Sequence, residues 1–141
     1  MKYLKFIALA VVLSVFLPAD AAKKPETTKA YLFGFAANFT DSVVYFTDIQ
    51  EIDSVTILKK SKFLKDRDSY SDQLRYYFSD KLKMDHRTCI VSYALTRKKA
   101  EKKYVKMRKL YTEKNAGRYD VRYITENDFK FQAILPVVIT E

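Results

Sequence analysis

The chain has only one cysteine, Cys89, among its 141 residues. A single thiol excludes an internal disulfide, so the stability of the fold must come from packing. Ile90 and Val91 follow Cys89 directly. Free cysteines are among the most buried residue types, and this context predicts a small core residue in a buried strand. A nucleophile or an intermolecular bridge is the alternative.

Other residue types that carry chemistry are equally scarce. The chain has one histidine, His86, two glycines, three prolines and no tryptophan. A histidine without another histidine or a cysteine at ligand spacing argues against a metal site or a triad. No glycine-rich phosphate loop and no nucleophile elbow occurs. The sequence therefore contains no metal, cofactor or catalytic signature.

The overall composition is that of a globular protein. Hydrophobic residues make up 48% of the chain and charged residues 30%. The length suits one domain, and the scarcity of glycine and proline favours regular elements joined by short connections. We predict a single domain over residues 30–141, preceded by a flexible, polar lead-in at residues 22–29.

The N-terminus has the three parts of a secretory signal peptide. Lys2 and Lys5 precede a 12-residue apolar run at 6–17, and Ala-Asp-Ala at 19–21 is a cleavage site. The run is shorter than the roughly 20 residues of a membrane-spanning helix. We therefore predict a signal peptide at 1–21, with an uncleaved anchor or a buried helix as the alternative. No cysteine lies near the cleavage site, so we expect release into the periplasm or medium and not a lipoprotein.

The most apolar and aromatic stretch of the mature chain is residues 30–49, and we expect the fold to condense around it. It predicts two antiparallel strands, at 30–37 and 42–48, joined by a polar turn. The second strand is apolar on both faces, which indicates burial on both sides. Gly34 in the first strand indicates a bulge or a close backbone approach, unless it is simply tolerated there.

Two amphipathic helices are predicted further along, at about 70–83 and 97–115. Ser69 and Asp72 resemble a capping box for the first helix. Thr96 is an N-cap for the second helix, and Gly117 follows its end. Apolar residues recur at spacings of three and four in both. They are Tyr70, Leu74, Tyr77, Phe78 and Leu82 in the first helix and Ala100, Tyr104, Met107 and Tyr111 in the second.

The remaining apolar runs predict a short strand at 55–58, an interior strand at 88–95, a half-buried strand at 119–124 and an edge strand within 129–139. The order β-β-α-β-α-β predicts an α/β fold, with α+β as the alternative. We expect a mixed sheet of four to five strands in which right-handed crossovers make three parallel strands neighbours. Whether the helices share one face stays open.

The positive charge is concentrated in the second helix. From residue 22 onward the net charge is +8, and residues 97–114 alone carry +7. Lys98, Lys102, Lys106 and Lys109 lie opposite the apolar face. Like charges at i and i+4 destabilise a helix by roughly 0.2–0.5 kcal/mol a pair, which a polyanion would relieve. This face predicts binding of an anionic glycan, lipopolysaccharide, phospholipid headgroup or nucleic acid, or else it only keeps the helix solvated.

An enzyme of this fold would hold its site at the carboxyl ends of the parallel strands. Asp48, Arg97 and Glu126 follow three of the predicted strands. Asp48 and Glu126 are candidates for a hydrolytic carboxylate pair, and Arg97 for holding an anionic substrate. The simpler interpretation is that they are turn and capping residues.

Five short stretches between about residues 30 and 124 carry a resemblance to other sequences. They are residues 39–48, residues 62–64 with Arg67, the pairs Tyr70-Ser71 and Gln73-Leu74, and residues 87–89. They resemble a family of small exported bacterial proteins of unknown function, which implies a bacterial envelope protein and no particular activity. We therefore expect a non-enzymatic binding or interaction module, with polyanion binding and carboxylate-pair hydrolysis as the alternatives.

Overall fold

A computed structural model describes residues 26–134 of the chain. The elements are β1 (Glu26–Ala37), β2 (Val43–Thr47), β3 (Gln50–Ile57), α2 (Arg67–Tyr76), β4 (Thr88–Ala94), α3 (Arg97–Lys109) and β5 (Asp120–Ile124). Each helix continues into a π-helical segment, η2 (Tyr77–Lys81) after α2 and η3 (Leu110–Lys114) after α3. The predicted signal peptide lies outside the described residues. Within 26–134, no helix has the length and apolarity that crossing a bilayer requires.

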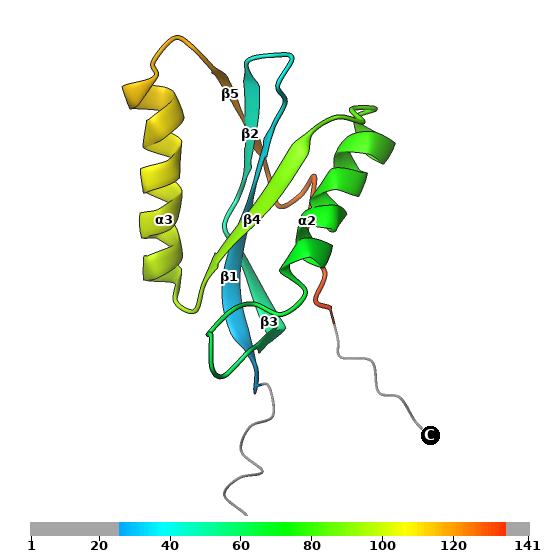
Figure 1. Ribbon diagram of the computed structural model, residues 1–141, viewed down its shortest axis with the longest axis vertical. Coiled ribbons are helices and arrows are strands. Elements are labelled where there is room, and N and C mark those ends of the chain that lie inside the picture. Colours follow the sequence, from blue (N-terminus) through cyan, green and yellow to red (C-terminus); the bar gives the residue numbers. More distant parts are fainter. Residues whose placement is uncertain (1–25, 135–141) are drawn as a thin grey trace, which may run out of the picture.

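β1 is the longest strand and lies at the centre of the sheet (Figure 1). Along one edge its first half pairs antiparallel with β3, and its second half pairs antiparallel with β2, where Phe35 is opposite Phe46. Along the other edge it pairs antiparallel with β4, where Phe35 is opposite Ile90. β5 lies beside β2 and parallel to it. The predicted mixed sheet with two helices is confirmed, in an α+β arrangement.

The neighbours of β4 differ from the prediction. β2, β4 and β5 run in the same direction, but β1 lies between β2 and β4, so the expectation of three neighbouring parallel strands is wrong. A crossover helix determines the direction of the next strand but not which strand it pairs with. The second edge of the long β1 has backbone groups without hydrogen-bond partners, and β4 pairs with this edge. β4 is consequently an edge strand among the described residues and not the interior strand predicted at 88–95.

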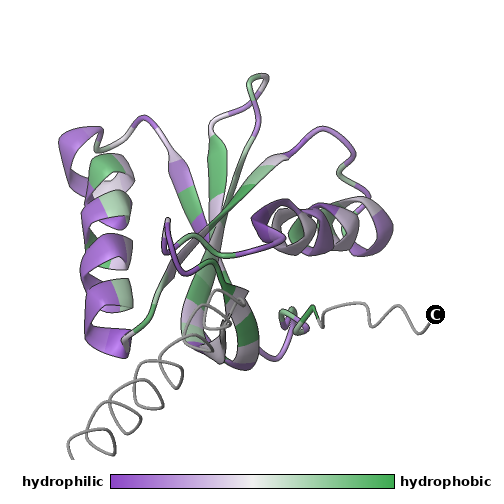
Figure 2. Ribbon diagram, turned by 60° about the horizontal axis from the view of Figure 1, so that its bottom comes forward, coloured by the Kyte–Doolittle hydropathy of each residue, from purple (hydrophilic) through white to green (hydrophobic). Residues whose placement is uncertain are grey.

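The two helices cover opposite faces of the sheet (Figure 1). α2 packs on the face that bears Leu32 and Ala36, and Leu74 of this helix is fully buried there. α3 packs on the other face, where Phe35 contacts Tyr111. Figure 2 shows α3 as apolar toward the sheet and hydrophilic on its outer side, as its periodicity predicts.

The N-termini of the two helices are stabilised in different ways. Thr96 caps α3 as predicted, since its side chain accepts a hydrogen bond from a backbone N–H of the first turn. α2 begins earlier than predicted, at Arg67, after Asp66 in the left-handed conformation with φ 59°. Ser69 and Asp72 therefore lie inside α2, and the predicted capping box is wrong. The turn at Asp66, whose carbonyl accepts from the N–H of Ser69, starts the helix instead.

Three strand boundaries also differ from prediction. β1 begins at Glu26, because residues 26–28 pair with residues 55–57 of β3, so part of the predicted lead-in is strand. β3 begins at Gln50 and not at the predicted residue 55, because residues 50–52 pair with residues 30–32 of β1. Residues 129–134 form no strand, and the rest of the predicted strand at 129–139 lies outside the described residues. The side chain of Gln50 bonds to the backbone of this segment where a neighbouring strand would.

Candidate functional site

The structure brings Asp48 and Glu126 together but gives their side chains different partners. The Asp48 carboxylate accepts a hydrogen bond from the backbone N–H of Glu126 at 3.1 Å. The Glu126 carboxylate lies 3.9 Å from the Lys130 ammonium. The guanidinium of Arg97 lies over the ring of Tyr31, 5.3 Å from its centroid. These contacts match the turn and capping interpretation, because the Asp48 carboxylate closes the turn after β5.

The positions of Cys89 and His86 do not support a catalytic or metal-binding role. Cys89 is half-buried in β4, and burial raises the pKa of its thiol to about 11. A thiol with this pKa is almost entirely protonated at neutral pH and is a poor nucleophile. His86 lies exposed in the loop before β4. Within residues 26–134, no three His, Cys, Asp or Glu side chains cluster in a way that would hold a metal ion.

The four predicted binding lysines of α3 form one exposed surface, which we call the lysine face (Lys98, Lys102, Lys106 and Lys109). They line a common open hollow together with Glu101 and Val105. Among the described residues, none of the four lysines forms an ion pair. Their charges are therefore available to an external anion, as the helical periodicity predicts.

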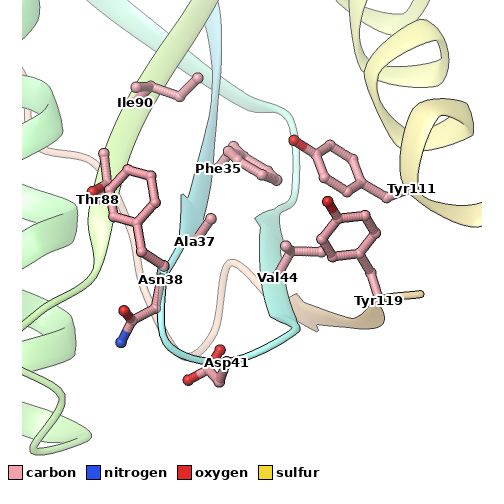
Figure 3. Close-up of a pocket in the computed structure, with 10 residues that line it drawn as sticks. Phe35, Ala37, Asn38, Asp41, Val44, Thr88, Ile90, Tyr111 and Tyr119 are labelled. Atoms are coloured by element: carbon pink, nitrogen blue, oxygen red, sulfur yellow. The ribbon is translucent and has the colours of Figure 1, made fainter. Parts of the chain in front are cut away.

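An apolar pocket that the sequence did not indicate lies between β4 and the end of α3. Its volume is about 320 Å³. Phe35, Val44 and Ile90 line it from the sheet, and Tyr111 and Tyr119 close it on the helix side (Figure 3). These three sheet residues occupy the face that α3 covers, but they lie toward its end, where the covering is incomplete.

The pocket walls are mainly apolar, and Tyr111 and Tyr119 add two hydroxyl groups to the polar side chains that also line it, those of Asn38, Asp41 and Thr88. Their rings meet edge to face, with centroids 4.9 Å apart. The hydroxyl group of Tyr111 is directed toward Phe35 (Figure 3). Burial, with a smaller effect of Tyr119, raises the pKa of Tyr111, so its hydroxyl stays protonated at neutral pH. Neither hydroxyl forms a hydrogen bond with a described residue, which leaves both for a ligand.

Phe39 stands at the rim of the pocket on the turn between β1 and β2. It is 98% exposed, and Ile90 on the neighbouring wall is 43% exposed. An exposed aromatic ring in a polar turn is unfavourably solvated and adds nothing to the packing of the core. An aromatic residue at the centre of the polar Asn-Phe-Thr turn is the one sequence feature that could have indicated this site. The other lining residues look like ordinary core residues until the elements are assembled.

Arg87 fixes the turn that carries Phe39. Its guanidinium donates to both carboxylate oxygens of Asp41, at 3.1 and 2.8 Å, and to the carbonyl of Val43 at 2.7 Å. It also lies over the ring of Tyr45, 5.2 Å from its centroid. The Arg87 side chain is only 5% exposed. The buried Arg87 guanidinium therefore fixes the conformation of the turn that forms the rim of the pocket.

Comparison with known proteins yields no relative: no family model, no curated protein and no solved structure matches the chain. The fold and the site together define a small α+β domain with an open apolar pocket on one face of its sheet and a separate basic helix surface. Its function must be inferred from these two features.

Proposed function

We propose that the chain is a non-enzymatic exported module that binds a small, apolar, ring-bearing ligand in the pocket between β4 and the end of α3. The observation that carries this proposal is the combination of mainly apolar walls with the hydroxyls of Tyr111 and Tyr119, which have no hydrogen-bond partner among residues 26–134. Ligand sites are typically apolar clefts of roughly 300–1,000 Å³ with a few polar groups that orient the ligand. Export rests on the signal-type residues 1–21.

The pocket favours a ring over an aliphatic chain. Phe35 and Tyr111 already contact each other with centroids 5.0 Å apart, so a third ring can join an existing aromatic cluster. Such contacts add about 0.5–1.5 kcal/mol to the burial of apolar area. A single ring that buries roughly 150 Å² gains about 4 kcal/mol from apolar burial, and part of this gain offsets the entropy lost on association. We therefore expect dissociation constants of about 1 mM or weaker for fragments.

The test is a titration of the ¹⁵N-labelled protein with indole, 2-naphthol and cyclohexanol, followed by chemical shifts. We expect saturable shifts for the two aromatic compounds, indole and 2-naphthol, at residues 35–39, 88–90 and 111–119, and weaker binding of the non-aromatic cyclohexanol. Ile90→Ser should weaken binding by about fivefold or more. Leu82→Ser, at a similarly exposed position away from the pocket, is the matched control. Absence of saturation, or equal effects of the two variants, would refute the proposal.

Polyanion binding through the lysine face is a second candidate function. The observation that favours it is the convergence of these four lysines, which form no ion pair with a described residue, on one hollow whose described lining has one acidic residue, Glu101. We would measure binding to heparin, lipopolysaccharide and duplex DNA at about 50 and 200 mM salt. Several phosphate-type contacts should reduce affinity by a factor on the order of 10³ over this range. A variant with all four lysines changed to Gln should lose this binding, and identical behaviour of both proteins would exclude it.

A further inference from the structure

A second hollow, of about 390 Å³, lies along the outer edge of β4, between the start of α2 and the first turns of α3. Four cationic side chains line it: Lys62, Arg67, Lys99 and Lys103. We propose that this edge hollow binds a small phosphate or sulfate monoester whose ester group is an apolar ring. It is distinct from the apolar pocket and from the lysine face, so it does not rest on either function proposed above.

Two of these cations are held in place by β4 itself. Lys103 donates to the carbonyl of Tyr93 at 2.8 Å, and Nε of Arg67 donates to the carbonyl of Val91 at 2.7 Å. These bonds cover the open edge of the strand, and they use one donor of each side chain. Both Nη groups of Arg67 have no partner among the described residues. A guanidinium with two free donors is suited to a bidentate oxyanion.

The positive charge around the edge hollow is not neutralised from within. No carboxylate of the part of the chain that the structure describes lines the hollow. Asp66 and Asp68 adjoin Arg67 in the sequence, but neither forms an ion pair among the described residues. The first turn of α3 contains three basic residues, Arg97 included, and no acidic one. Cations at a helix N-terminus oppose its macrodipole, and a bound anion would relieve that repulsion.

Apolar surface beside the cations indicates the second part of the ligand. Phe63 and Leu95, which also line the hollow, are 65% and 45% exposed. The ring of Tyr93 lies between Arg67 and Lys103, whose charged groups are 5.8 and 5.4 Å from its centroid. An inorganic ion would leave this apolar surface in water, whereas a ring attached to the anion would cover it.

Calorimetric titration of the purified protein with phenyl phosphate, phenyl sulfate, inorganic phosphate and phenol at low salt tests this proposal. We expect saturable binding of both phenyl esters and at least tenfold weaker binding of inorganic phosphate and of phenol. If inorganic phosphate binds as tightly as phenyl phosphate, the claim that the ligand carries an apolar ring is refuted. If neither ester shows saturable binding, the proposed site itself is refuted.

Paired variants separate this site from general electrostatic attraction. Lys99→Gln with Lys103→Gln should raise the dissociation constant of phenyl phosphate about tenfold or more. Lys106→Gln with Lys109→Gln removes the same charge from the same helix outside the hollow, and should change it less than about threefold. Lys99→Gln alone, which breaks no side-chain hydrogen bond or ion pair among the described residues, should weaken binding several-fold without a loss of stability. Equal effects of the two pairs would overturn the proposal.

Discussion

The side-chain amide of Gln50 holds the backbone of Phe131 in the way that a neighbouring strand would. Its oxygen accepts from the N–H of Phe131 at 2.7 Å, and its nitrogen donates to the carbonyl of Phe129 at 2.8 Å. Gln73 of α2 repeats this arrangement with both backbone groups of Gln132, at 2.9 and 2.8 Å. Two carboxamides thus fasten the segment after β5 to the rest of the domain.

The first prediction concerns these two glutamines. Gln50 is fully buried, so Gln50→Leu would leave the N–H of Phe131 and the carbonyl of Phe129 unpaired. The free energy of unfolding should fall by about 2–4 kcal/mol. Gln73→Leu should cost less than about 1 kcal/mol, because its bonds are exposed to water that can replace them. Urea unfolding of both variants measures the difference, and equal losses would contradict the burial argument.

The second prediction concerns the contact of Gly34 with α2. A Cβ at this position would lie 2.5 Å from Cδ2 of Leu74 and 3.3 Å from Cγ2 of Thr47. Gly34→Ala should therefore destabilise the fold by about 1–3 kcal/mol through overpacking. In the double variant with Leu74→Ala, the added methyl group partly fills the space that the leucine leaves. The combined loss should be smaller than the sum of the single losses, and simple additivity would argue against the contact.

The third prediction concerns the buried guanidinium of Arg87. Asp41→Asn removes the charge that pairs with it, and we expect a loss of about 1–2 kcal/mol in urea unfolding. This value is at the lower end for such pairs because the Asp41 side chain is 39% exposed. Asp120→Asn is the matched control, since its pair with Arg122 is exposed on both sides and should contribute less than about 0.5 kcal/mol. Losses of the same size would show that burial of Arg87 is unimportant.

The fourth prediction concerns Cys89. Burial raises its pKa from 9.0 to about 11, so alkylation at pH 8 should be about 100-fold slower than for a peptide thiol. The folded chain holds this proton more tightly than the unfolded chain does. Stability from this site is therefore complete below about pH 9 and is lost as the pH rises toward about 11. Tyrosines also ionise in this range, so the control is Cys89→Ser, which should show a shallower decline than the wild type.

Local patterns predicted the parts of the fold that depend on near neighbours. The spacing of Ala100, Tyr104 and Met107 and the cap at Thr96 identified α3, and the same periodicity placed the lysine face. The apolar run from residue 129 misled, because it is typical of a strand, whereas the hydrogen bonds that hold this segment come from a glutamine far away in the sequence. A side-chain amide that replaces the hydrogen bonds of a neighbouring strand produces no periodic pattern in the sequence.

The candidate sites show the same division. The apolar pocket combines Phe35, Ile90 and Tyr119, which come from segments that are far apart in the sequence. Their adjacency depends on β4 taking the free edge of β1, which no local pattern specifies. The edge hollow likewise needs Arg67 and Lys103 from two helices on opposite faces of the sheet. Residue type predicted charge and burial at these positions, but only the strand order brings them together.

The central place of β1 has a consequence for how the chain acquires its fold. Tyr31 pairs with Ala94, so one edge of β1 stays open until more than sixty further residues are available. Closing so long a loop is entropically costly and tends to slow folding. A chain that ends before β4 would leave one edge of this aromatic strand unpaired. Copies truncated before β4 should therefore aggregate more readily than the chain that includes β4.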